Sequence, residues 1–210
     1  MSNTVSKPCG LIPVKDTNGA PYNGNVNLYY VPQADATALF IGDCVKSAAG
    51  GSPLNGAPAV TLAGARNAAL SVGPIRGVVV GIGTANSAGT VINADPTNLD
   101  AVSIPATKTK DYYVWVADSP DLIFEAQADA IVVANFNKNC PLFVSTAPTG
   151  VVNQSQSYAQ GSAAAVTATL PLRLLGGVNA PDNDLTAPGT FGRVYVQINT
   201  HELASNTVGV

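Results

Sequence analysis

Three short stretches hold the side chains that could carry acid–base chemistry or bind a cation. His201 and Glu202 are adjacent, and a histidine beside a carboxylate can exchange protons near neutral pH. Asp182-Asn183-Asp184 and Asp118-Ser119-Pro120-Asp121 offer oxygen ligands to calcium, which takes about six to eight of them. Neither aspartate spacing completes a calcium loop, and no serine or cysteine lies in a nucleophile motif. We therefore interpret the aspartates as turn residues and His201 as a surface or core histidine. We expect no enzyme, no metal site and no cofactor.

Other sequence patterns exclude nucleotide, nucleic-acid and zinc binding. The segment GVVVGIG, residues 77–83, contains neither GxGxxG nor GxxxxGK[ST], so it is read as a strand. Ten dispersed basic residues and a net charge of −3 do not make the basic patch that nucleic acids require. One histidine and three widely spaced cysteines do not make a zinc site. Cys9, Cys44 and Cys140 are interpreted as reduced, small apolar side chains, which favours synthesis in a reducing cytosol.

The composition predicts an all-β protein. Only 11% of the 210 residues are charged, against a typical ~25%, and 11 of the 13 acidic residues are Asp. Asp favours turns, whereas Glu and Lys populate helix surfaces, and 20 Gly and 15 Pro divide the chain into short apolar runs. A surface with so few charges is typical of proteins that are packed in an assembly. A secreted β protein with a neutral exterior would have a similar composition.

Strands are predicted wherever β-branched and aromatic residues form short runs between turn residues. About nine or ten such strands favour a sandwich, a jelly roll or a small barrel. The turn at 118–121 would join two of these strands into a β-hairpin with a core of Tyr113, Trp115 and Phe124. The predicted strands are Val26–Val31, Leu39–Ile41, Cys44–Lys46, Val60–Leu62, Pro74–Ile82, Tyr112–Ala117, Leu122–Ala126, Pro141–Ser145, Val166–Leu175 and Arg193–Asn199.

The two ends of the predicted domain differ in character. Residues 1–25 are polar and aperiodic, which indicates an extended N-terminal arm, whereas residues 26–210 form a single β domain. Four apolar residues of the arm could dock on a partner, namely Leu11, Ile12, Val14 and Tyr22. The alternative is a frayed terminus. Residues 146–164 are a long polar loop. No secretory signal or apolar run of membrane-spanning length occurs, so no membrane partner is expected.

The order of several motifs resembles a known family. The chain reads KPCGLIPV, NGAPYNG, YYVP, LFIGDCV, GVVVGI, YYVWVADSPDLIFEAQAD, TATLPLRLLGGVNAPDN and RVYVQINTHEL. In this it resembles the capsid decoration, or cement, proteins that are encoded beside the major capsid protein in tailed bacteriophages. The resemblance implies a β-rich, symmetric oligomer on the outer surface of the virion, synthesised in the host cytoplasm. It also implies that the protein stabilises the icosahedral head by bridging neighbouring major capsid subunits.

From this resemblance we expect two partners, the major capsid protein and further copies of the chain. A homotrimer is favoured, with a homodimer as the alternative. The contacts with the coat are assigned to Leu11, Ile12, Val14 and Tyr22 and to the 146–164 loop. The alternative function is a receptor- or glycan-binding β module of a virion spike or fibre. That alternative requires an exposed aromatic platform made of Tyr29, Tyr30, Tyr112, Tyr113 and Trp115, so the burial of these residues distinguishes the two functions.

Overall fold

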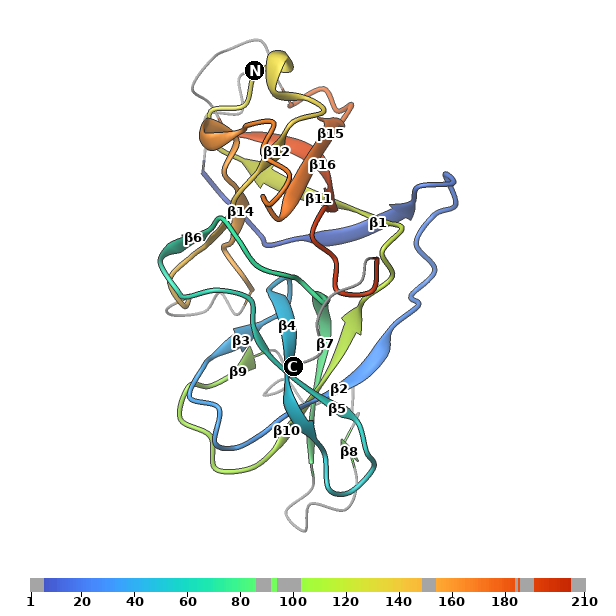
Figure 1. Ribbon diagram of the computed structural model, residues 1–210, viewed down its shortest axis with the longest axis vertical. Helices are drawn as coiled ribbons and strands as arrows, with labels where there is room; N and C mark the ends of the chain where they lie inside the picture. Colours follow the sequence, from blue (N-terminus) through green and yellow to red (C-terminus); the bar gives the residue numbers. More distant parts are fainter. Residues whose placement is uncertain are drawn as a thin grey trace.

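The computed structural model describes residues 6–85, 92–93, 103–148, 154–183, 185 and 191–204. These residues form an elongated molecule with two lobes stacked along its long axis (Figure 1). Strands and two 3₁₀ turns, η2 (Val133–Asn135) and η3 (Gly161–Ala163), are the only regular elements in the described residues, so the predicted all-β class is confirmed. Residues 149–153 of the predicted loop lie outside the described residues.

One lobe is a small closed barrel of five strands. Its strands follow the order β10-β2-β5-β4-β7, and β10 also pairs with β7, which closes the ring. All neighbours are antiparallel except β2 and β5. A small barrel was one of the three predicted architectures. Its strands are β2 (Asn27–Val31), β4 (Cys44–Gly51), β5 (Pro58–Leu62), β7 (Gly77–Ala85) and β10 (Tyr112–Ala117). Beside them lie β8 (Ile92–Asn93), which pairs with β7, and the two-stranded pair β3 (Leu39–Phe40) and β9 (Ser103–Ile104).

The other lobe is built on one eight-stranded sheet. Seven strands follow the order β12-β15-β16-β11-β14-β13-β6, and β1 pairs with β11 off this path. The sheet brings together segments from both ends of the chain, because Ile12 pairs with Glu125 and Phe124 pairs with Val196. Its strands are β1 (Ile12–Asp16), β6 (Ala68–Leu70), β11 (Leu122–Ala128), β12 (Asn139–Cys140), β13 (Leu142–Val144), β14 (Tyr158–Ala159), β15 (Leu172–Gly177) and β16 (Gly192–Ile198).

The predicted hairpin at 118–121 is wrong, although its two strands are present. β10 pairs with β2 and β7, whereas β11 pairs with β1, β16 and β14, so the turn connects the barrel to the second sheet. The physical reason lies in the burial pattern. Nearly every residue of both strands is buried, and a strand covered on both faces needs neighbours in more than one layer. A two-stranded hairpin on the surface would have left one face of each strand in water.

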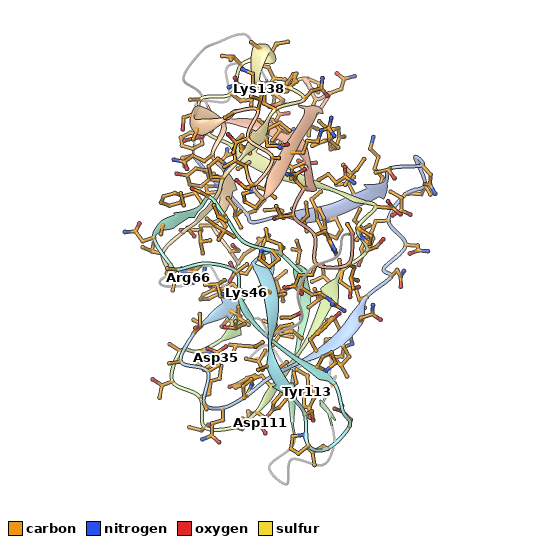
Figure 2. The ribbon with its side chains drawn as sticks, in the orientation of Figure 1. Asp35, Lys46, Arg66, Asp111, Tyr113 and Lys138 are labelled. Atoms are coloured by element: carbon orange, nitrogen blue, oxygen red, sulfur yellow. The ribbon has the colours of Figure 1, made fainter. Side chains whose placement is uncertain are left out.

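The predicted hairpin core is divided in the same way. Phe124 is fully buried in the main core, which runs through both lobes. Tyr113 belongs to a separate small cluster, where its ring lies 5.7 Å from that of Tyr30. Figure 2 places Tyr113 within the barrel lobe. Trp115 belongs to neither cluster: it is half-buried and packs over Gly81, where an added Cβ would lie 3.2 Å from the indole ring. The prediction of one shared core for these three residues is therefore wrong.

The strand count also differs from the prediction, because the described residues contain sixteen strands. Several extra strands have only two residues, too short to give a periodic signal, and one of them, β14, lies in the predicted loop at 146–164. The longer strands were predicted in part: β10 has the predicted bounds, whereas β4 continues to Gly51 and residues 166–171 of the predicted strand Val166–Leu175 lie outside β15. β16 alternates between buried and half-buried residues along its whole length, as RVYVQIN indicated. A five-residue strand, β1, lies within the predicted N-terminal arm and was not expected there.

Candidate binding surface

The N-terminal segment crosses the barrel at a close backbone contact. Gly10 and Gly42 both have positive φ, +76° and +90°, and Leu11 N–H donates to the carbonyl of Gly42 at 3.0 Å. A Cβ at Gly10 would lie only 2.5 Å from that carbonyl oxygen. Only glycine combines positive φ with so short a distance, so these two glycines fix where the arm lies.

Further hydrogen bonds hold the same segment to β11 of the second sheet and to Gln154, which bridges to Ile41. Lys7 N–H donates to the side-chain oxygen of Gln127 at 2.9 Å, and the side-chain amide of Gln154 donates to the carbonyl of Cys9 at 3.0 Å. Leu11 is 1% exposed and lies in the main core. In this structure residues 7–16 are therefore fastened to the domain over most of their length.

An apolar groove opens where this segment lies against the barrel, and we call it the arm groove. Its volume is about 300 Å³. Ile12, which is 41% exposed, forms part of its wall beside Val80 of β7. Exposed apolar hollows of this kind favour contact with another apolar surface. The lining residues are Leu11, Ile12, Pro13, Tyr22, Ile41, Gly42, Val79, Val80 and Gln154.

The structure brings three of the four predicted coat-contact residues to this groove. Ile12 and Tyr22 offer partly exposed side chains, whereas Leu11 is a buried part of its floor. Val14 does not line the groove; it is half-buried, and its carbonyl accepts a hydrogen bond from Tyr22 N–H at 2.9 Å. The sequence did not single out Ile41 or Val79 and Val80, because the apolar run of a strand does not show which of its residues lie at a groove.

A buried polar cluster joins the two lobes near the turn at 118–121, and we call it the junction cluster. The Tyr29 hydroxyl donates to Asp118 at 2.5 Å and accepts from Arg76 Nε at 2.8 Å. The other oxygen of Asp118 accepts from the Asn27 amide at 2.8 Å. Arg76 also lies 3.9 Å from Glu202, which accepts from the backbone N–H of Ser47 at 2.8 Å. The cluster thus links the barrel, the turn and the C-terminal segment.

The junction cluster brings His201 and Glu202 close to Asp118, which the sequence did not predict. Asp118 is 4% exposed and His201 is 1% exposed, and neither lines the arm groove. His201 Nδ1 accepts a hydrogen bond from Leu203 N–H at 3.0 Å. The carboxylate of Asp118 and the imidazole of His201 are enclosed by the protein, and Asp118 is hydrogen-bonded to Tyr29 and Asn27. The arrangement of the junction cluster is that of a structural link, and His201 is a core histidine.

The burial of His201 leads to a prediction about pH. Burial lowers the pKa of His201, and Arg76 adds to this, while the Asp118 carboxylate partly opposes it. In the unfolded chain His201 takes up a proton near pH 6.5, whereas in the folded protein it does so only at a lower pH. The free energy of unfolding therefore decreases as the pH falls from about 6.5 to the lowered pKa of the folded state. Asparagine does not titrate, so His201→Asn lacks this pH dependence. We expect the difference in free energy of unfolding between wild type and His201→Asn to be smaller at about pH 5 than at about pH 8. Urea unfolding at each pH measures this, and a constant difference would contradict it.

A second buried charge pair also links the lobes. Asp43, which is fully buried, accepts from Arg66 Nη2 at 2.5 Å and from the backbone N–H of Phe40 at 2.9 Å. The same guanidinium donates to the carbonyls of Ala38 at 2.8 Å and Ser145 at 3.5 Å. Ser145 follows β13 of the second sheet, so Arg66 connects that sheet to the barrel; Figure 2 shows it at the level where the lobes meet.

Comparisons with known proteins identify no relative of this chain. No protein-family model, curated protein or solved structure matches this chain. Across the described ranges, no three His, Cys, Asp or Glu residues gather in a way that could hold a metal ion. The described part of the chain also contains no helix with the length and hydropathy of a membrane span.

Proposed function

We propose that this chain is a structural virion protein that binds the outer surface of an icosahedral phage head. It stabilises the shell by bridging neighbouring major capsid subunits. The observation that carries the proposal is the arm groove, since an exposed apolar hollow lies where the arm residues Ile12 and Tyr22 meet the barrel. The bridging role itself comes from the resemblance of the chain to capsid decoration proteins.

The surface composition supports a role in an assembly. With 11% charged residues the protein has few charges to place at an interface, so its contacts with a coat would be made by apolar side chains and backbone groups. Such contacts are not weakened by salt, unlike exposed charge pairs. The elongated two-lobed shape would allow one molecule to reach more than one coat subunit (Figure 1).

Oligomerisation would make weak individual contacts sufficient. In a symmetric oligomer each further contact forms at a high effective concentration, which raises the overall affinity by orders of magnitude. A homotrimer at a three-fold position of the shell is the assembly we favour, with a homodimer as the alternative. Neither nucleic acid nor membrane is needed for this role.

The receptor-binding alternative loses the surface on which it depended. Four of the five aromatic residues of its platform are at most 8% exposed, and only Trp115 is half-buried. Tyr29 is committed to the junction cluster, and burial followed by the hydrogen bond to Asp118 raises its pKa. The burial of these four tyrosines in the barrel supports the structural role over the receptor-binding one.

The proposal is tested on virions of the phage that encodes this chain. We expect quantitative mass spectrometry to find the protein at a copy number comparable with that of the coat protein, and retained after a wash in molar sodium chloride. In virions carrying Ile12→Asp, retention should fall at least about tenfold, equal to about 1.4 kcal/mol, because a buried carboxylate would oppose apolar contact.

Val166→Asp is the matched control, because it makes the same kind of change at a residue that is 89% exposed and outside the arm groove. It should leave retention unchanged. Circular dichroism of both purified variants checks that they fold. A wild-type protein present in no more copies than the shell has vertices would overturn the proposed function, whereas equal retention of both variants would move the contact away from the groove.

A further inference from the structure

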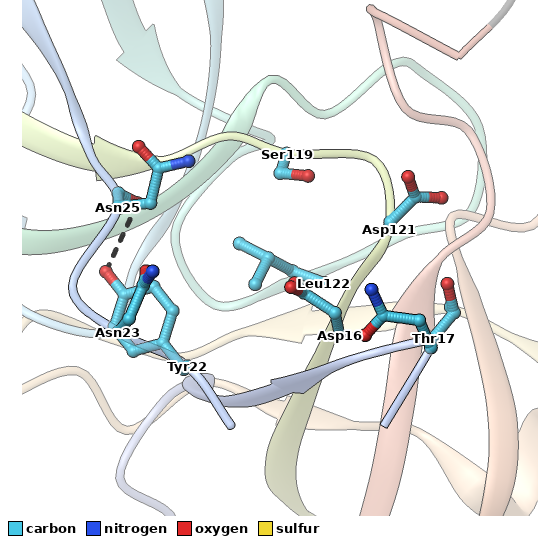
Figure 3. Close-up of a pocket in the computed structure, with 9 residues that line it drawn as sticks. Asp16, Thr17, Tyr22, Asn23, Asn25, Ser119, Asp121 and Leu122 are labelled. Atoms are coloured by element: carbon cyan, nitrogen blue, oxygen red, sulfur yellow. Dashed lines mark hydrogen bonds between the residues drawn. The ribbon is translucent and has the colours of Figure 1, made fainter. Parts of the chain in front are cut away.

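A second hollow lies on the other side of Tyr22 and differs from the arm groove in chemistry. We call it the polar hollow; its volume is about 220 Å³. Figure 3 shows it between the end of β1, the returning segment at 23–25 and the turn that leads into β11. Its lining residues are Asp16, Thr17, Asn18, Tyr22, Asn23, Asn25, Ser119, Asp121 and Leu122.

Backbone hydrogen bonds fix the walls of the polar hollow. Thr17 N–H donates to the carbonyl of Asp121 at 2.9 Å, which ties the loop after β1 to the turn before β11. Within that loop, Asp16 N–H donates to the carbonyl of Ala20 at 2.8 Å, and Ala20 N–H donates to the side chain of Asn18 at 2.8 Å. A hollow whose walls are already fixed loses little conformational entropy when it binds a ligand.

The side chains of the hollow combine hydrogen-bond acceptors with donors. The Asp16 and Asp121 carboxylates accept only, whereas the three asparagine amides and the hydroxyls of Thr17 and Ser119 can both donate and accept. Within the described part of the chain, neither carboxylate forms a hydrogen bond or an ion pair through its side chain. Their capacity to accept hydrogen bonds is therefore available to a ligand.

Two lining residues supply apolar surface beside these polar groups. Leu122 is 3% exposed, and Figure 3 shows its side chain between Asn23 and Asn25 on one side and Asp121 on the other. Tyr22 forms a second apolar wall, and its hydroxyl is directed to the carbonyl of Asn25 at 3.4 Å. A ligand that fits such a site carries many hydroxyl groups on a small ring that also has C–H faces.

We propose that the polar hollow binds a single uncharged sugar ring. The hydroxyls of a pyranose both donate and accept, which matches carboxylates and amides placed together, and its C–H face would lie against Tyr22 or Leu122. The hollow is smaller than the roughly 300–1,000 Å³ of pockets for drug-sized molecules, so one ring is the natural size. This inference does not depend on the proposed capsid role.

The charge of the hollow excludes other ligand classes. Two carboxylates without a cationic side chain in the lining would repel phosphates and acidic sugars. Lys15, the nearest lysine in the sequence, has its ammonium 4.9 Å from the ring centre of Tyr195 and does not line the hollow. Calcium takes about six to eight oxygen ligands, and the described residues hold no cluster of three or more His, Cys, Asp or Glu side chains that could hold it; the EDTA and calcium arms of the test below separate a cation from a sugar.

The test uses saturation-transfer difference NMR, because a site open to solvent binds one sugar only weakly. The probes are the methyl glycosides of glucose, galactose, mannose and N-acetylglucosamine, each added to the purified full chain in the presence of EDTA. We expect at least one glycoside to bind, with an affinity that Asp121→Ala weakens at least about tenfold. Asp182→Ala is the matched control, because that aspartate has a side chain that is 70% exposed and lies outside the hollow. It should bind as the wild type does.

Three results would overturn the proposal. The first is that none of the four glycosides gives a signal with the wild-type protein. The second is a signal that Asp121→Ala leaves unchanged, which would place the sugar elsewhere. The third is a rise in melting temperature with calcium chloride alone that Asp121→Ala abolishes, which would make the hollow a cation site. None of these results bears on attachment to virions, so the proposed function is judged separately.

Discussion

Phe124→Ala is expected to lower the free energy of unfolding by about 3–5 kcal/mol, among the largest losses that a single substitution can cause here. Phe124 is fully buried, and its strand β11 is paired at this residue with β16 on one side and with β1 on the other. Truncation would leave a cavity in the core, under a sheet whose neighbouring strands are far apart in the sequence. Because these strands are held by their own hydrogen bonds, they cannot collapse into the space.

Urea unfolding of Phe124→Ala beside Trp115→Ala makes the test specific. Trp115 is half-buried and lies outside both apolar clusters, so its removal should cost clearly less than that of Phe124. If Phe124→Ala does not fold, Phe124→Leu serves in its place, since it keeps most of the apolar volume and should lie between wild type and alanine. A Trp115→Ala loss equal to or larger than that of Phe124→Ala would show that the indole, rather than β11, holds the barrel.

Trp115 lies in β10, a strand whose bounds the sequence predicts but whose partners it does not. The bounds of β10 were predicted correctly because six aromatic and aliphatic residues stand between a lysine–aspartate pair and a turn. The partner of β10 was not, because the pattern of a strand states which residues are buried but not which strand lies beside it. Proximity in sequence favoured β11, whereas the structure pairs β10 with β2 and β7.

The candidate binding surface was predicted only in part, because local sequence pattern identifies apolar residues but not which of them face the core. Ile12 and Tyr22 stood out because they are large apolar residues in a polar segment, and both line the arm groove. Leu11 stood out equally but faces the core, since only the crossing at Gly10 and Gly42 decides which side of the arm meets the barrel. That crossing depends on a contact between positions thirty-two residues apart, which local periodicity does not reveal.

The buried role of Asp118 could not be predicted from the sequence. Asp118 was assigned to a turn, and it does follow the last residue of β10, yet its carboxylate is also the centre of the junction cluster. Its partners Tyr29 and Asn27 lie 89 and 91 residues away. An aspartate at a turn is ordinarily exposed, as Asp121 is, so nothing in the DSPD motif distinguishes the buried acid from the exposed one.

This difference between two aspartates of one turn gives the final prediction. Asp118→Ala should lower the free energy of unfolding by about 3–5 kcal/mol, because it removes the buried carboxylate that pairs with Arg76 at 3.6 Å and leaves the Tyr29 hydroxyl without its acceptor. Asp121→Ala, in the same turn but exposed, should change it by no more than about 0.5 kcal/mol. Urea unfolding at neutral pH measures both. Equal effects would mean that the turn, and not the carboxylate of Asp118, joins the lobes; a large effect of Asp118→Ala alone would identify the junction cluster as the link that holds the barrel and the second sheet together.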